Sequence, residues 1–166
     1  MTNVPKLYTP QDSAVVFIDH QPQMTFGVAN IDRALLMNNV TLLAKVAKEF
    51  RVPAVITAVE TESFSGYVWP QLLDVFPGQT VIERSSMNSW NDAGFRQAIH
   101  DTGRKNILLT GLWTEVCVAI PIASRSDNPW MVRPRIRDES RLAREQREQQ
   151  QLESVGSNEK PRVDEG

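Results

Sequence analysis

The sequence predicts an α/β fold in which a parallel sheet is flanked by helices, a three-layer arrangement of the Rossmann-like kind. Short aliphatic runs alternate with longer amphipathic stretches as far as about residue 122, and this alternation is typical of βαβ units. The first run, residues 14–18, has no polar residue, as expected of a strand buried on both faces. A chain of 166 residues that is 41% hydrophobic is long enough for one such domain.

The elements that follow the first strand alternate in the same way. Apolar residues recur at helical spacing over residues 32–50, and Asp32 stands where a carboxylate suits the helix dipole, so we expect a helix there. Residues 54–59 and 80–82 predict the second and third strands. Between these strands, the glycines and prolines of residues 60–78 predict a loop with one short helix near residues 69–75.

Another helix and a fourth strand complete the predicted sheet. Asn91 or Asp92 can cap a helix that runs to about Thr102, and Gly103 suits the left-handed residue that ends it. The run at residues 106–110 predicts the fourth strand.

The composition changes abruptly after residue 122. The last 44 residues hold 8 arginines and only 10 apolar residues, too few to build a core. Within them, residues 138–153 carry Arg/Glu pairs at helical spacing but are polar on nearly all faces, which leaves a lone helix and disorder as alternatives. We therefore predict an incomplete α/β domain in residues 1–122 and a charged tail, Arg/Gln/Glu-rich, in residues 123–166.

Charge and cysteine content exclude several classes of function. A net charge of -2 gives no reason to expect nucleic acid or a membrane as partner, so a small-molecule substrate is expected. One cysteine and two scattered histidines exclude an intrachain disulfide and a Cys-based zinc site. No signal core or membrane-spanning run is present, which predicts a cytoplasmic protein. A nucleotide-binding module is disfavoured because no glycine-rich phosphate loop occurs.

Three residues that could carry chemistry follow predicted strands. In an open α/β sheet, ligands bind outside the carboxyl ends of the strands, so Asp19, Arg84 and Cys117 should converge on one rim. Cys117 would lie in the first turn of a helix, where free N–H groups stabilise a thiolate, or else be a buried core thiol. Asp19 either faces the cleft or caps a turn, and Arg84 either pairs with Asp19 or lies on the surface.

Three segments resemble the isochorismatase-like cysteine hydrolases, and most closely their YcaC-like branch. They are residues 16–21, 84–92 and 110–118, and the resemblance covers about residues 5–122. It implies that Cys117 is the nucleophile, Asp19 the base that takes its proton, and Arg84 the cation that holds both. The implied substrate is a small amide, ester or vinyl-ether-like molecule, and the family implies a homo-oligomer without a cofactor.

The resemblance also implies details of the substrate pocket. A cis peptide between Trp113 and Thr114 would aim backbone N–H groups at the substrate's carbonyl oxygen. From their positions rather than from the resemblance, His20 is assigned to shaping the pocket, and Trp90 and Trp113, near the predicted rim, either wall the pocket or pack in the core. The family more often has lysine at the position of Arg84, and arginine excludes a role in proton transfer there. Metal-binding relatives carry histidines after the second strand; residues 58–63 contain none, so a metal-free site is expected.

Two alternatives to an active hydrolase stay open. The chain departs from the family pattern near Ile122, for which a frame-shifted or truncated sequence is the simplest account, so the protein would be a catalytically impaired member. It could instead be a non-enzymatic, oligomeric binding protein on the same fold. If the later strands are lost, the fourth strand is left with an open edge, which predicts self-association or aggregation.

Overall fold

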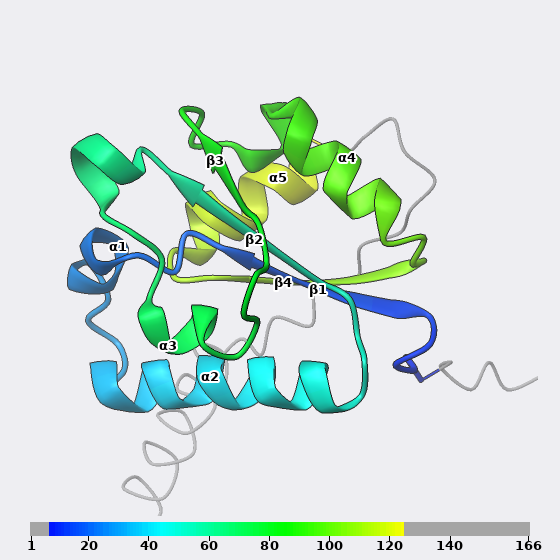
Figure 1. The fold of residues 1–166 in the computed structure, drawn as a ribbon. Helices are drawn as coiled ribbons and strands as arrows, with labels where there is room; N and C mark the ends of the chain where they lie inside the picture. Colours follow the sequence, from blue (N-terminus) through cyan, green and yellow to red (C-terminus); the bar gives the residue numbers. More distant parts are fainter. Residues whose placement is uncertain (1–6, 125–166) are drawn as a thin grey trace, which may run out of the picture. The chain divides into compact units, whose positions relative to one another are not determined.

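The structure, a computed structural model, describes residues 7–124 of the chain (Figure 1). The predictions for the charged tail fall almost wholly outside the described residues. No helix within residues 7–124 is both long and apolar enough to cross a membrane.

Four parallel strands form one sheet in the order β3-β2-β1-β4. Helices α2 and α3 lie on one side of this sheet and α4 and α5 on the other, which confirms the predicted α/β class with three layers (Figure 1). The strands are β1 (Ser13–Ile18), β2 (Ala54–Val59), β3 (Val81–Arg84) and β4 (Asn106–Gly111). The third strand ends later than predicted, so that Arg84 belongs to the strand and pairs with Val59.

Side-chain caps begin the two longest helices. Asp32 accepts a hydrogen bond from the N–H of Leu35 at 2.9 Å, and Asp92 accepts one from the N–H of Phe95 at 2.7 Å. The helices are α1 (Pro22–Phe26), α2 (Arg33–Glu49), α3 (Pro70–Leu73), α4 (Ala93–Asp101) and α5 (Ala119–Ala123). Of these, α1 was not predicted, because its five residues are too few for helical periodicity to show in the sequence.

Three further single turns connect these elements. They are the π-helical turns η1 (Thr61–Ser65) and η3 (Thr114–Val118) and the 3₁₀ turn η2 (Ser89–Asn91). Along the chain, η1 follows β2, η2 follows β3 and η3 follows β4. They therefore shape the end of the sheet at which the candidate residues lie.

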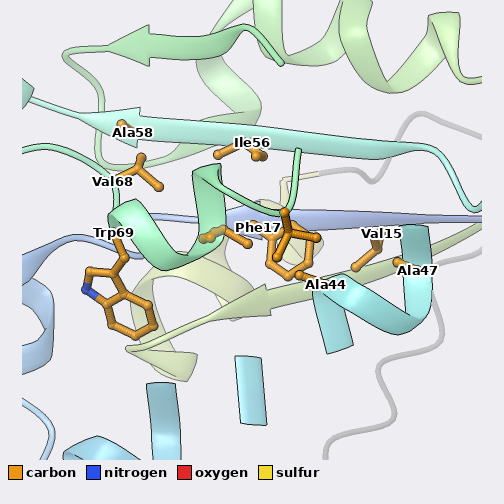
Figure 2. Close-up of a cluster of buried hydrophobic side chains, with 10 residues drawn as sticks. Val15, Phe17, Ala44, Ala47, Ile56, Ala58, Val68 and Trp69 are labelled. Carbon is orange, nitrogen blue, oxygen red and sulfur yellow. The ribbon is translucent and has the colours of Figure 1, made fainter. Parts of the chain in front are cut away.

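One core cluster lies between the sheet and α2 with α3 (Figure 2). Phe17 of β1 and Ile56 of β2 are neighbours in the sheet, and both are fully buried against Ala44 of α2. Trp69, at the start of α3, is buried in the same cluster. Because alternate strand residues point to opposite faces, Val15 and Phe17 of β1 take this side of the sheet.

A second core cluster lies on the opposite face. Val16 and Ile18 of β1 pack there with Phe95 and Ile99 of α4, and the cluster also contains Cys117. The prediction that β1 is buried on both faces is confirmed, since all six of its residues are buried. As a consequence, Asp19, the residue directly after β1, lies in the buried interior.

Strand β4 is less well covered than β1. It lies at one edge of the four-stranded sheet that residues 7–124 form, and Leu108 is 38% exposed. Within the described part of the chain, β4 pairs only with β1. Exposed edge strands are sites of association with other chains.

Candidate active site

Asp19 lies directly after β1 in a backbone conformation that few residues adopt. Its φ is 55°, in the left-handed region, and its N–H donates to the carbonyl oxygen of Thr57 on β2 at 3.1 Å. Aspartate tolerates this region better than most residues. The turn leaves the Asp19 side chain fully buried at the end of the sheet.

Arg84, the last residue of β3, forms a buried ion pair with Asp19. Its Nη2 donates to Asp19 Oδ1, and both side chains are fully buried. Its Nη1 donates to the carbonyl oxygens of Ser86 and Met87, and its Nε donates to Thr57 Oγ1 at 3.1 Å. All three nitrogens of the guanidinium therefore donate hydrogen bonds, as a buried charge requires.

Cys117 lies in η3, the turn that follows β4. Its side chain is fully buried, and its N–H donates to the carbonyl oxygen of Trp113 at 2.8 Å. The turn packs closely on the end of β4: a Cβ placed on Gly111 would lie 2.9 Å from the Cβ of Cys117. Glycine at position 111 is thus what allows the cysteine to approach the strand.

The thiol and the carboxyl group are neighbours. The charge of Asp19 and its side-chain contact with the thiol both raise the pKa of Cys117, and the contact with Cys117 lowers the pKa of Asp19. Asp19 Oδ1 accepts from Arg84, whereas Oδ2 is buried and has no hydrogen-bond partner among the described residues. One carboxyl oxygen therefore holds the cation, while the other has no hydrogen-bond partner within residues 7–124.

Burial governs the protonation of both groups. Burial first, and then the negative charge of Asp19, raises the pKa of the Cys117 thiol from 9.0 to about 12. Burial also raises the pKa of Asp19, while the charge of Arg84 works against that rise. The prediction of a thiolate is therefore wrong. Burial raises the pKa of Cys117 by more than the backbone hydrogen bond of the turn and the charge of Arg84 lower it, so Cys117 is a neutral thiol.

The shape of the site also differs from the expectation. The three residues were predicted on one rim, with Asp19 facing a cleft, but Asp19 and Cys117 are 0% exposed and Arg84 is 4% exposed. The predicted cis peptide between Trp113 and Thr114 is also wrong, because residues 7–124 contain no cis peptide bond. The turn is instead made with Trp113 extended, at φ -109° and ψ 95°.

His20 packs in the core rather than on an open pocket wall. Its ring makes edge-to-face contacts with Phe17 and Trp69, at centroid distances of 5.7 and 5.4 Å. Burial lowers the pKa of His20 to about 3, so its imidazole is neutral near pH 7.

The two predicted wall tryptophans lie beside the cluster that contains Cys117. Trp113 reaches across to α1, where its Nε1 donates to the carbonyl oxygen of Met24 at 2.9 Å and its ring lies against Gly27. Trp90 packs edge-to-face on Phe95 with a centroid distance of 6.2 Å. Thr114 is the first residue of η3.

Gln21 is a structural member of the site that sequence reasoning missed. It is fully buried, and its side-chain amide donates to the carbonyl oxygens of Val59, at 3.0 Å, and Gly66. Its Oε1 accepts from the N–H of Val59 at 3.0 Å. The amide thus imitates a strand backbone and ties the segment after Asp19 to the end of β2. A glutamine next to a buried strand was the only signal, and it could equally have been solvent-exposed.

The acidic residues near η1 bond to neighbouring hydroxyl groups. Glu83 accepts from Thr61, Glu60 accepts from Ser63, and Glu62 accepts from Tyr67. Among residues 7–124, no three His, Cys, Asp or Glu side chains are grouped so that they could hold a metal ion.

The chain is similar to known proteins along this same segment. The isochorismatase domain model matches residues 13–123. YcaC from Escherichia coli (strain K12), described as a probable hydrolase, is 35% identical over 114 residues, which are 68% of this chain and 55% of that protein. This chain therefore spans only about half the length of that relative.

Two solved structures extend the similarity to the fold. YcaC from Pseudomonas aeruginosa, with hexane-2,5-diol and covalent acrylamide, has a TM-score of 0.74 and 31% identity over 79% of this chain and 65% of that chain. The YcaC gene product from Escherichia coli, an octameric hydrolase of unknown specificity, has a TM-score of 0.71 and 33% identity over 76% of this chain and 64% of that chain.

Proposed function

Because the chain belongs to the isochorismatase family, we propose that it is a cysteine hydrolase acting on a small amide or ester, or on a vinyl-ether-like substrate. The observation that carries this proposal is that the two oxygens of the Asp19 carboxyl group have different contacts. Oδ1 is bound by Arg84, and Oδ2 is buried without a hydrogen-bond partner in the described part of the chain, in a carboxyl group whose charge acts on the Cys117 thiol. An oriented, unoccupied carboxylate oxygen next to a thiol is what general-base activation requires.

The first half of the reaction forms a thioester. As Sγ of Cys117 attacks the substrate's carbonyl carbon, Asp19 Oδ2 takes the thiol proton and the carbonyl oxygen becomes an oxyanion. The tetrahedral intermediate then collapses: the bond from carbon to the leaving amine or alcohol breaks, and the leaving group receives the proton from Asp19. The products are a free amine or alcohol and an acylated Cys117.

The second half of the reaction releases the acid. Asp19 removes a proton from water as the water oxygen attacks the thioester carbon. When the second tetrahedral intermediate collapses, the carbon–sulfur bond breaks and Sγ takes the proton back from Asp19. The thiol and the carboxylate are thereby restored, and no redox step is involved.

The proposal explains why a base is needed at all. A thiol whose pKa is raised to about 12 supplies almost no thiolate near pH 7, so its proton must leave during the attack. Arg84 stays protonated throughout, since guanidinium does not deprotonate in proteins. Its part is to orient Asp19 and to stabilise the carboxylate form of the base.

The substrate-binding residues are part of the same proposal. The catalytic side chains are buried, so a substrate reaches them only when neighbouring side chains move. We assign Trp113 and Trp90 to the wall of the pocket and the backbone N–H of Thr114 to the oxyanion. The N–H groups of Val116 and Cys117 already donate to the carbonyl oxygen of Trp113, which leaves them unsuited to that task.

Alkylation by acrylamide tests the proposed nucleophile. Cys117 is the only cysteine in the chain, so the mass of the intact protein reports its modification directly. Near pH 7 we expect addition at least about tenfold faster than to N-acetylcysteine. The rate should change little from pH 7 to 9, whereas that of the free thiol rises about tenfold per pH unit while its thiolate forms.

Two variants make this test specific. Cys117→Ser should give no adduct, and Asp19→Asn should lower the rate by about 10²-fold or more because it removes the base. If Cys117 reacts no faster than the free thiol, or if Asp19→Asn keeps the rate, the hydrolase proposal fails. The chain would then be an impaired family member or a non-enzymatic binding protein.

We also propose that the chain forms homo-oligomers. The YcaC gene product of Escherichia coli is octameric. In this chain, the edge strand β4 and exposed apolar side chains such as Leu42 and Leu108 offer surfaces for self-association.

A further inference from the structure

Thr57 is the one polar residue in β2, whose sequence is AVITAV. It is fully buried in the middle of the sheet, between Ile18 of β1 and Ile82 of β3. A buried hydroxyl group costs free energy unless both its proton and its lone pairs are used. Valine at this position would fit the strand without burying a hydroxyl group.

The hydroxyl group of Thr57 makes two hydrogen bonds in defined directions. Oγ1 donates to the carbonyl oxygen of Ile82 at 2.8 Å and accepts from Arg84 Nε at 3.1 Å. Since the bond to Ile82 fixes the hydroxyl proton, a lone pair is left facing the guanidinium. The main-chain oxygen of Thr57 separately accepts the N–H of Asp19 at 3.1 Å.

The contact at Nε differs from the other contacts of Arg84. Ser86 and Met87 bind Nη1, and Asp19 binds Nη2, so these three acceptors hold the far end of the guanidinium. Thr57 holds the end nearest the side-chain stem. Contacts at Nη1 and Nη2 alone still let the guanidinium plane tilt about the line through these two nitrogens, and a third contact at Nε removes that tilt.

We propose that Thr57 is a positioning residue. Its hydroxyl group fixes the plane of Arg84, so that Arg84 binds Asp19 through Oδ1 and leaves Oδ2 without a partner. This inference rests on the proposed function for its effect on rate, but the effect on Arg84 itself does not depend on catalysis.

Paired substitutions at Thr57 separate the hydroxyl group from the methyl group. Thr57→Val removes only the hydroxyl and keeps the main-chain bond to Asp19, while Thr57→Ser keeps the hydroxyl. The matched control is Thr110→Val, because Thr110 Oγ1 also donates to a carbonyl oxygen on a neighbouring strand, that of Val16 at 3.0 Å, without bonding to Arg84. Thermal unfolding of each variant shows that it is folded.

The first measurement is the rate of acrylamide addition to Cys117. Thr57→Val should lower it roughly 10-fold to 100-fold, the factor that one hydrogen bond to a charged group can supply. Thr57→Ser and Thr110→Val should stay within about threefold of the unsubstituted protein. Equal rates for Thr57→Val and the unsubstituted protein, or an equal loss in Thr57→Ser, would overturn the proposal.

The second measurement observes Arg84 directly. Hydrogen exchange of the Arg84 Nε–H, followed by NMR and assigned by its loss in Arg84→Lys, should be at least about tenfold faster in Thr57→Val only. Unchanged exchange would refute the positioning role even if the thiol proved inert. Faster exchange in Thr57→Val with an inert Cys117 would instead refute the hydrolase proposal and leave the placement of Arg84 established.

Discussion

Asp19 and Arg84 lie at the ends of β1 and β3, on either side of β2, whereas Cys117 follows β4 at the edge of the described sheet. We refer to Asp19, Arg84 and Thr57 as the ion-pair half of the site, and to Gly111 and Cys117 as the thiol half. Every residue of β1 is buried, but β4 has one buried residue in six positions. The ion-pair half is bound by hydrogen bonds and the thiol half by close packing.

This difference shows where each kind of group can be held. Two opposite charges far from water are stable only while they remain paired and hydrogen-bonded, and the centre of the sheet supplies fixed acceptors for that purpose. A neutral thiol needs no such partners and can lie in a turn beside a less covered strand. Substitutions in the ion-pair half should therefore act by leaving a buried charge unpaired, and those in the thiol half by disturbing the packing of the turn.

The largest effect on stability is expected for Arg84→Met. It leaves the buried Asp19 carboxylate without its cation, and breaking such a pair typically costs about 3–5 kcal/mol in the free energy of unfolding. Urea unfolding measures the loss. Arg96→Met is the control, because the Arg96 side chain lies on the surface and donates to the carbonyl oxygen of Trp90, so its loss should be about 0.5 kcal/mol or less. Equal losses of unfolding free energy in the two variants would show that the buried ion pair contributes no more to stability than a surface arginine.

Alkaline pH should destabilise the protein through the thiol half. The pKa of Cys117 is about 12 when folded and 9.0 as the ordinary value, so the folded state keeps a proton that the unfolded state has lost. Stability is then fully present below about pH 9 and decreases as the pH rises towards 12, by up to about 4 kcal/mol. Urea unfolding at several pH values, with Cys117→Ser as reference, isolates this contribution. Parallel curves for the two proteins would contradict it.

Gly111→Ala tests the close packing of the thiol half. The added Cβ would meet the Cβ of Cys117 at 2.9 Å and Cγ2 of Val118 at 3.1 Å, and such overpacking costs about 1–3 kcal/mol. We also expect slower acrylamide addition, because the thiol must shift. Gly94→Ala is the control: its added Cβ would meet only Oδ1 of Asp92, at 3.2 Å, and Cγ2 of Ile82, at 3.8 Å, so it should change stability by less than about 1 kcal/mol. A tolerated Gly111→Ala would mean that the turn is not tightly packed.

The smallest effect on stability is expected at the exposed edge. Leu108→Lys should change the free energy of unfolding by about 0.5 kcal/mol or less, yet reduce self-association because a charge on an edge strand opposes pairing with another chain. Sedimentation velocity measures the association. Leu42→Lys, on the exposed face of α2, is the comparison. If only Leu42→Lys lowers association, the interface involves α2 rather than β4.

Local patterns in the sequence determined most of the elements. The second strand has the bounds predicted for it, and Asp32 and Asp92 cap their helices, because periodicity and capping depend on residues within one turn or one pleat. The convergence of Asp19, Arg84 and Cys117 was also predictable, since parallel strands end on the same edge of a sheet. The family and its fold followed from the same segments.

Only the tertiary structure decided how the three residues behave. Thr57 lies 27 residues before Arg84, and Gln21 bonds to Val59 across 38 residues, so neither partnership leaves a local signal. The raised pKa of Cys117 was predicted in the wrong direction because a turn position says nothing about desolvation, which comes from side chains on several elements. Periodicity reports which face of an element is buried; the charge state of a group depends on everything packed around it.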